Sequence, residues 1–183
     1  MSVPLLSKLD EWTVEDLVAL PHDGRRYEIV DGSLVVSPAP GIRHEVVVEA
    51  VRQVLRQAVP PGLRLLGTIS VAFGRNVRIP DVVVVREELV TRDVLAAAPE
   101  DVVLAVEVVS PSSVTTDRVT KPTQYAAVGI NHYWRVEPSE GPLLAVYERV
   151  GGVYVERGTW TGHDEAVLDR PFPVRLVPAE LTR

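Results

Sequence analysis

Apolar residues recur with two different periods along the chain, and these periods predict short helices and strands. A capping-box pattern in residues 13–16 opens a short helix that ends at Pro21. Residues 26–38 predict two short strands joined at Asp31-Gly32, a dipeptide typical of hairpin turns. From His44 to Ala58 the apolar residues follow helical spacing, which predicts an amphipathic helix.

The middle of the chain contains its most apolar segments. Residues 63–73 and 78–85 are each predicted to form one strand. Residues 102–109 are apolar almost throughout, as is typical of a central strand buried on both faces. A short helix is predicted to run to Gly129, and residues 132–138 predict the next strand. The order helix, three strands, helix, strand indicates an α+β core with a mixed sheet, flanked by β-hairpins.

The C-terminal part predicts a hairpin over residues 143–160 and a last strand near Val174–Val177. No repeat and no linker divides the 183 residues, so we expect one domain. Its parts are an N-terminal helix and hairpin, a core, and a C-terminal hairpin and strand: residues 1–40, 41–138 and 139–183.

Composition excludes several kinds of chemistry. The chain has no cysteine, which rules out disulfides, zinc–thiolate sites, iron–sulfur clusters and cysteine nucleophiles. The net charge of −6 argues against broad electrostatic binding of nucleic acid, although it allows an enzyme whose acidic site holds metal ions. The apolar runs are too short for a membrane helix, and the N-terminus lacks a signal-peptide stretch. We therefore expect a cytoplasmic protein without a membrane span.

Two carboxylates stand out against this apolar background. Glu107 lies inside the apolar run 102–109, where an ionised carboxylate costs several kcal/mol (roughly) unless it is paired or metal-bound. Asp81 follows Pro80 at the start of another strand. If the two strands are neighbours, Mg²⁺ or Mn²⁺ is the natural partner for both carboxylates. The alternative is that Asp81 caps a turn and Glu107 pairs with an arginine, and these two residues alone favour that alternative.

Lys121 makes the metal-site interpretation of Asp81 and Glu107 more favourable. It is one of only two lysines, follows Glu107 by fourteen residues, and lies at or near the start of a predicted helix. Asp117, Lys121 and Tyr125 are four residues apart and share one face of a continuous helix, although Pro122 indicates a helix start near Lys121. The alternative is a solvated ion pair worth about 0.3–0.5 kcal/mol.

The order Pro80-Asp81, then Glu107 in an apolar strand, then Lys121 resembles the PD-(D/E)XK nuclease superfamily. More specifically, the chain resembles its Uma-type family of restriction endonucleases. The resemblance covers nearly the whole chain. One departure is Val109, which stands where a lysine would complete a Glu-x-Lys motif; in the Uma-type family the lysine comes from the following helix, a position that Lys121 matches. The matching segments are YEIVDG (27–32), His44, RIPDVVVV (78–85), AVEVVSPSS (105–113), Asp117, Lys121, Tyr125 and GINHYWRVEP (129–138).

The resemblance implies a metal-dependent endonuclease that acts on DNA. Asp81, Glu107 and the backbone carbonyl of Val108 would hold Mg²⁺ or Mn²⁺ against a phosphate. Lys121 would orient or deprotonate the attacking water, or stabilise developing charge, and a lysine beside a cation is expected to have a depressed pKa. Restriction enzymes usually cleave as dimers, so the analogy also predicts a homodimer.

Two further candidates rest on the resemblance. It implies that Glu28 joins the acidic cluster, and the alternative is an exposed glutamate on a hairpin strand. It makes His44 a candidate for phosphate contact or proton transfer, and the alternative is a hydrogen-bonding residue at a helix start. Two other functions stay open for the whole chain: a catalytically silent binding or scaffold protein, and a hydrolase that acts on some other phosphodiester.

Overall fold

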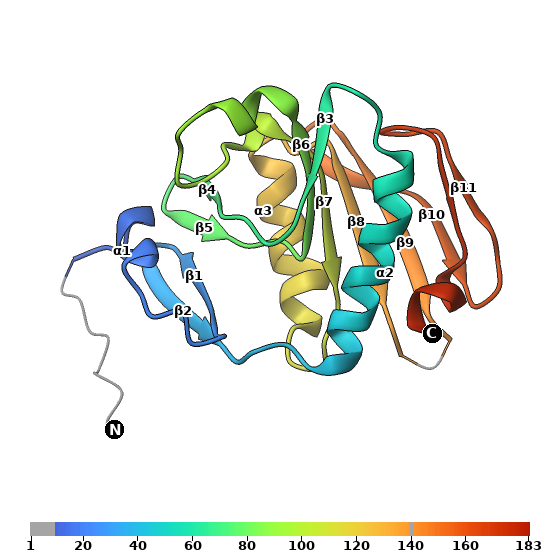
Figure 1. Cartoon of the computed structure of the whole chain (residues 1–183), viewed down its shortest axis with the longest axis horizontal. Helices are drawn as coiled ribbons and strands as arrows, with labels where there is room; N and C mark the ends of the chain where they lie inside the picture. The colour runs from blue at the N-terminus through green and yellow to red at the C-terminus, as the bar shows by residue number, and fades with distance from the viewer. Residues whose placement is uncertain (1–9, 140) are drawn as a thin grey trace.

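A computed structural model describes residues 10–139 and 141–183 (Figure 1). Residues 1–9, which contain Lys8 and the segment inspected for a signal peptide, lie outside the described residues. The helical segments are α1 (Val14–Val18), α2 (Ile42–Ala58), η1 (Glu87–Thr91), η2 (Pro99–Asp101), η3 (Thr116–Thr120), α3 (Lys121–Ala127) and η4 (Pro178–Thr182). The strands are β1 (Arg26–Val30), β2 (Ser33–Ser37), β3 (Leu63–Leu66), β4 (Val71–Phe73), β5 (Asn76–Arg78), β6 (Val82–Arg86), β7 (Val102–Val108), β8 (His132–Glu137), β9 (Leu143–Val150), β10 (Val153–Thr161), β11 (Ala166–Leu168) and β12 (Val174–Leu176).

Two larger sheets organise these strands. A six-stranded sheet has the order β10-β9-β8-β7-β6-β3, and a four-stranded antiparallel sheet has the order β2-β1-β5-β4. Only the β7–β8 pair of the larger sheet is parallel, and α3 lies in the connection between those two strands. The predicted α+β fold is confirmed: α2, β3, β6, β7, α3 and β8 occur in the predicted order along the chain, with β4 and β5 of the smaller sheet between β3 and β6.

Two of the predicted strands are wrong in their extent. Residues 63–73 form β3 and β4, and residues 78–85 are divided between β5 and β6. Each segment passes from one sheet to the other, around Gly67 and around Pro80, which has no N–H to donate to a ladder. Apolar side chains are buried or partly buried on both sides of each break, so the hydrophobic pattern alone does not mark it. The predicted N-terminal hairpin is therefore extended by β5 and β4 into a sheet.

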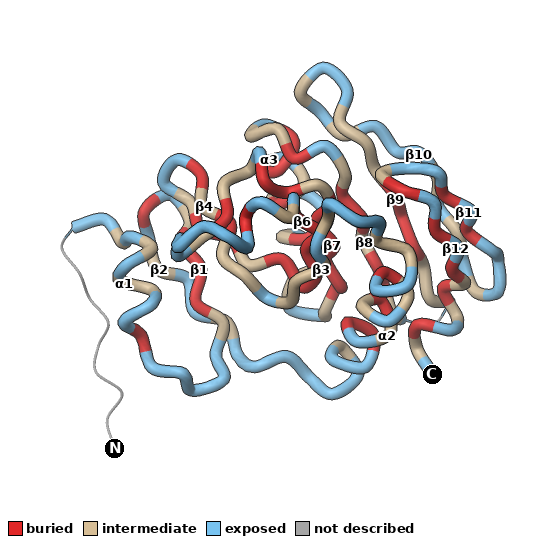
Figure 2. The backbone as a smooth tube through the Cα atoms, turned by 45° about the horizontal axis from the view of Figure 1, so that its top comes forward, coloured by how far each residue is buried: buried red, intermediate tan, exposed pale blue. Residues whose placement is uncertain are grey.

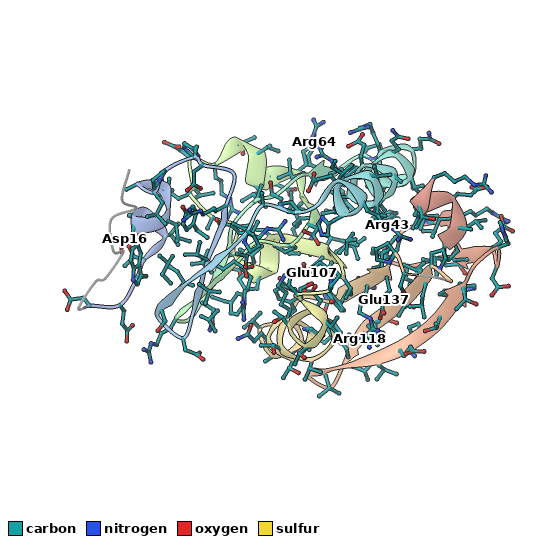
Figure 3. The ribbon with its side chains drawn as sticks, turned by 90° about the horizontal axis from the view of Figure 1, so that it is seen from below. Asp16, Arg43, Arg64, Glu107, Arg118 and Glu137 are labelled. Carbon is teal, nitrogen blue, oxygen red and sulfur yellow. The ribbon has the colours of Figure 1, made fainter. Side chains whose placement is uncertain are left out.

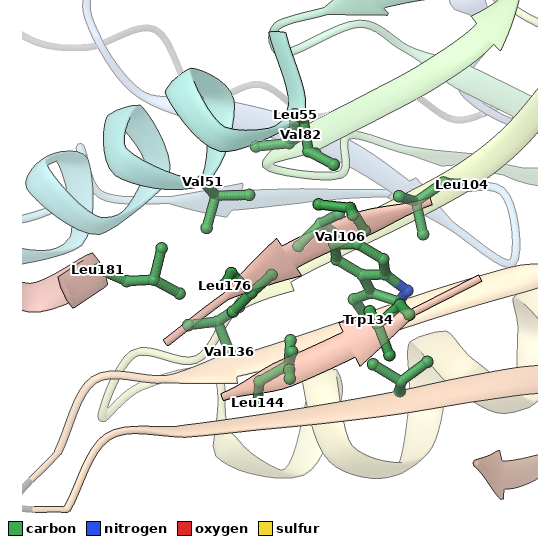
Figure 4. Packing of buried hydrophobic residues seen from close by; sticks show 14 of the residues in the cluster. Val51, Leu55, Val82, Leu104, Val106, Trp134, Val136, Leu144, Leu176 and Leu181 are labelled. Carbon is green, nitrogen blue, oxygen red and sulfur yellow. The ribbon is translucent and has the colours of Figure 1, made fainter. Parts of the chain in front are cut away.

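The six-stranded sheet is covered on both faces. Helix α2, the β11–β12 pair and η4 pack on one face, where Val51, Leu55 and Trp134 belong to one cluster (Figure 4). Helix α3 and β4 pack on the other face, where Tyr125 and Tyr133 are buried. Because side chains alternate along β6 and β7 and both faces are buried, these strands are apolar almost throughout (Figure 2). The predicted buried central strand is confirmed.

Local sequence signals are also confirmed. Asp31 and Gly32 both have positive φ, 49° and 79°, as the predicted two-residue hairpin turn requires. The Thr13 side chain caps α1, and Gly129 ends the segment after α3 with a φ of 98°. Helix α2 buries its predicted apolar stripe against the sheet. Among the described residues, no helix is long and apolar enough to cross a membrane.

Candidate active site

A cleft of about 540 Å³ brings the predicted site residues together. Its lining comes from β1, the loop 38–41, the first turn of α2, the residue before β6, the end of β7 and the start of α3. Glu107 lies inside the molecule beside α3 (Figure 3). The predicted site residues that line the cleft are Glu28, His44, Asp81, Glu107, Val108 and Lys121.

Glu107 is fully buried, and both of its carboxylate oxygens accept a hydrogen bond from one helix. Lys121 Nζ donates to Oε2 at 2.8 Å, and the Tyr125 hydroxyl donates to Oε1 at 2.8 Å. Lys121 is only 4% exposed, and its Nζ also lies 3.2 Å from Asp117 Oδ1. The alternative of a solvated surface ion pair between Asp117 and Lys121 is therefore wrong.

The turn before α3 sets the position of Lys121. Residues Thr116–Thr120 form a π-helical turn, a feature that is frequent at functional sites, and it runs directly into α3 at Lys121. Helical structure is continuous from residue 114, so the predicted helix start near Lys121 is wrong. The Tyr133 hydroxyl donates to the Asp117 carbonyl at 2.6 Å, which ties this turn to β8. Asp117 Oδ1 is buried and accepts no hydrogen bond from any residue that the structure describes.

Asp81 lies beside Glu107 because β6 and β7 are antiparallel neighbours. Val82 pairs with Val106, so the same register places Asp81 opposite Glu107. The Val108 N–H donates to Asp81 Oδ2 at 2.8 Å, which holds the carboxylate at the end of β7. Directly opposite residues of an antiparallel pair share one face of the sheet, with Cβ atoms about 4.5–5.5 Å apart.

Positive groups from two other elements reach Asp81. Arg26 of β1 donates from Nη2 to Asp81 Oδ1 at 2.7 Å, and His44 Nε2, near the start of α2, lies 3.3 Å from Oδ2. The proposed pairing of Glu107 with an arginine is wrong, because the arginine is on Asp81 and a lysine is on Glu107.

Glu28 is buried rather than exposed, so the alternative for this residue is wrong. Its Oε1 accepts the Ile79 N–H at 2.8 Å, and its Oε2 accepts Arg78 Nη1 at 3.3 Å. Arg78 also donates from Nε to Gln124 Oε1 at 2.9 Å. Glu28 thus links β1 to the chain between β5 and β6, and through Arg78 to α3. Its membership of a metal site stays a prediction.

The environments of Asp81 and Glu107 move their pKa values in opposite directions. Burial favours a higher pKa for Asp81, but the hydrogen bond from His44 and the charge of Arg26 outweigh it and lower the pKa to about 2. Burial raises the pKa of Glu107 to about 8, although Lys121 opposes the shift. The site therefore holds one ionised and one protonatable carboxylate, a division typical of catalytic sites.

The acidic residues around Lys121 raise its pKa above the ordinary value for a lysine. Burial favours a lower pKa for Lys121, but attraction to Glu107, Glu28 and Asp117 outweighs it and raises the pKa. The depressed pKa expected for Lys121 beside a bound cation stays a prediction. Lys121 carries its proton at neutral pH and acts as a donor.

The donors of this cleft fit a hard divalent cation. Asp81 and Glu107 offer buried carboxylate oxygens side by side, which is the chemistry that Mg²⁺ and Mn²⁺ prefer. Among residues 10–139 and 141–183, no three His, Asp or Glu side chains are placed to hold a metal by themselves.

The shifted pKa of Glu107 predicts a pH-dependent stability. Folded Glu107 keeps its proton up to about pH 8, whereas the unfolded carboxyl loses it near the ordinary value of 4.5, so unfolding releases a proton between these values. The free energy of unfolding should fall by up to about 1.4 kcal/mol per unit of rising pH. Urea unfolding of metal-free protein at pH 5 and pH 6 measures this slope. Both pH values lie below the range in which the titration of His44 changes the free energy of unfolding.

The Glu107→Gln variant is the control, because it has no carboxyl to titrate and should lose that slope. A wild-type unfolding free energy that stays constant from pH 5 to pH 6 would contradict the prediction.

Sequence reasoning missed the roles of Arg26, Arg78 and Tyr125. Arg26 and Glu28 alternate along β1 and share one face, which was a usable signal for Arg26. Tyr125 follows Lys121 by one helical turn, but only the buried position of α3 turns its hydroxyl toward Glu107.

Residues 14–181 match the model of the Uma2 family, whose description is "Putative restriction endonuclease". A crystal structure from Anabaena variabilis ATCC 29413, described as "a putative nuclease belonging to DUF820", has a similar fold with a TM-score of 0.69. The two chains are 18% identical over 93% of this chain and 97% of that one. No curated protein matches the sequence. Because the family model spans nearly the whole chain, this protein belongs to the Uma2 family.

Proposed function

We propose that the protein is a metal-dependent endonuclease that hydrolyses phosphodiester bonds of DNA. One observation carries the proposal: buried Glu107, bridged by Lys121 and Tyr125, lies opposite Asp81 in a cleft open to a ligand. Membership of a family described as restriction endonucleases supports nuclease chemistry in general. Divalent metal dependence and DNA as substrate are the finer parts of the proposal.

Asp81 and Glu107 would hold the cation, with the Val108 carbonyl as a further ligand. The bound ion supplies Lewis-acid activation of water and neutralises charge on the phosphate. The water oxygen would form a bond to phosphorus and give up one proton to solvent, the ester P–O bond would break, and the leaving oxygen would take up a proton from solvent. Lys121 is protonated and is held by Glu107 and Asp117. It would therefore orient the water or stabilise the developing charge rather than remove a proton.

His44 and Glu28, which line the cleft, would support this arrangement. His44 Nε2 lies 3.3 Å from Asp81 Oδ2, and this residue would contact a phosphate or transfer a proton. Glu28 would fix the N-terminal sheet against the site. Residues 1–183 would act as one nuclease domain, and the homodimer stays a prediction.

Incubation with supercoiled plasmid tests the proposal. We expect nicking with Mg²⁺ or Mn²⁺, loss of nicking when EDTA removes the metal, and recovery when metal is added back. Metal binding measured by titration on the same sample is the control.

Nicking that persists in EDTA would contradict metal dependence. Metal binding without cleavage of any plasmid would favour the silent scaffold, and cleavage of a different phosphodiester would favour another hydrolase.

A further inference from the structure

Arg26 occupies a carboxylate that the proposed metal would use. Its guanidinium lies 2.7 Å from Asp81 Oδ1, and the side chain is 19% exposed and lines the cleft. The 2.7 Å distance makes this contact a salt bridge between a guanidinium and a buried carboxylate. A divalent cation and Arg26 would therefore compete for the same negative charge.

The second arginine that lines the cleft is fixed in place. Arg78 is buried and donates to both Glu28 and Gln124, so its guanidinium is held by neutral and acidic partners away from Asp81. Arg26 has one described partner, Asp81, for its guanidinium. Of these two arginines, Arg26 is the one that a change at Asp81 would release into the cleft.

A released guanidinium has suitable chemistry for a phosphate. Its planar fork can donate two parallel hydrogen bonds to phosphate oxygens, and it stays charged at every relevant pH. Arg26 from β1 and Lys121 from α3 line the same cleft. A phosphate that contacts both residues would meet positive groups from two different elements.

We propose that Arg26 is a phosphate-binding catalytic residue that rests on Asp81 until a divalent cation displaces it. This inference rests on the proposed nuclease function. In the resting protein Arg26 neutralises Asp81; in the loaded protein the cation takes over that task and Arg26 contacts the substrate phosphate. Arg26 thus opposes metal binding and supports cleavage, two effects of opposite sign.

These opposite signs define the experiment. The Arg26→Ala variant should bind Mn²⁺ alone about tenfold more tightly than wild type, because its competitor for Asp81 is gone. Its nicking of supercoiled plasmid at saturating Mn²⁺ should fall by about 10²–10³-fold, the range for one lost electrostatic contact. Calorimetric titration without DNA measures the first effect, and melting curves confirm that the variants are folded.

Two further variants separate charge from geometry. Arg26→Lys keeps the positive charge and should bind Mn²⁺ within about twofold of wild type, yet nick about tenfold more slowly because an ammonium lacks the fork. The matched control is Arg25→Ala, since Arg25 is the exposed neighbour that pairs with Asp23. It should leave both Mn²⁺ binding and nicking unchanged.

The inference is overturned if Arg26→Ala binds Mn²⁺ no more tightly than wild type, or if its nicking equals that of Arg25→Ala. Weaker Mn²⁺ binding together with a lower melting temperature would assign Arg26 a structural role and overturn it as well. Failure of the proposed function has a different signature, because wild-type protein would then show no metal-dependent nicking at all.

Discussion

Replacing Lys121 with arginine should lower plasmid nicking by about 10²–10⁴-fold, the range for a positioned proton-transfer or donor group. The ammonium lies 2.8 Å from Glu107 and 3.2 Å from Asp117, so both carboxylates fix its position. A guanidinium keeps the charge but is larger and planar, and it cannot place a nitrogen at the Nζ position with the same contacts. Metal-dependent nicking at saturating Mg²⁺ measures the loss.

The same substitution should also reduce stability. An exposed ion pair would tolerate arginine with almost no change, which is the outcome expected for a surface lysine. Lys121 is buried, and inserting extra atoms into a packed site costs about 1–3 kcal/mol. The control is Arg64→Lys, which alters an exposed ion pair with Glu87 and should change neither nicking nor melting. Wild-type nicking by Lys121→Arg would remove Lys121 from the mechanism.

The anomaly of Glu107 is visible in the sequence because the apolar run around it is a local feature, although Asp81 and Glu107 alone favour a turn cap and an arginine pair. A glutamate inside an apolar strand is costly wherever that strand packs, so Glu107 is an anomaly before any partner is known. Asp81 follows from the same argument, since it precedes four valines that pack on both faces of the sheet. The two residues meet because β6 and β7 are neighbours in that sheet, which their common apolar character favours.

The positive partners were harder to predict because their contacts are not local. Arg26 lies 55 residues from Asp81, and an arginine on a hairpin strand has the same sequence signature whether it is solvated or paired. The hydrophobic pattern indicates that a strand is buried but not which sheet it joins. It therefore predicts one strand for residues 63–73 and one for residues 78–85, where the structure has two in each case. The crossing of the chain at Pro80 also positions Asp81 at the cleft.

Replacing Glu107 with glutamine should reduce metal-dependent nicking by at least about 10³-fold. Glutamine has nearly the same shape and still accepts the Tyr125 hydrogen bond, but it carries no negative charge for a cation and offers an amide N–H₂ to Lys121. A metal ligand contributes several kcal/mol of charge stabilisation, and each 1.36 kcal/mol (roughly) corresponds to a factor of ten in rate. Nicking and Mn²⁺ titration on the same preparation measure both losses.

The chain offers a matched control in Glu137→Gln. Glu137 is also a buried glutamate held by positive groups, Arg118 and Arg135, but it is not among the residues that line the cleft. Figure 3 shows it beside Arg118. Its pKa is lowered, since burial is outweighed by hydrogen bonds from Arg118 and the charge of Arg135, so the substitution should cost about 1–3 kcal/mol of stability. Nicking should nevertheless stay at the wild-type level. If both variants lost nicking in proportion to their lost stability, Glu107 would be a structural residue. If only Glu107→Gln lost nicking, the loss would come from the role of Glu107 in the cleft and not from removing a buried charge.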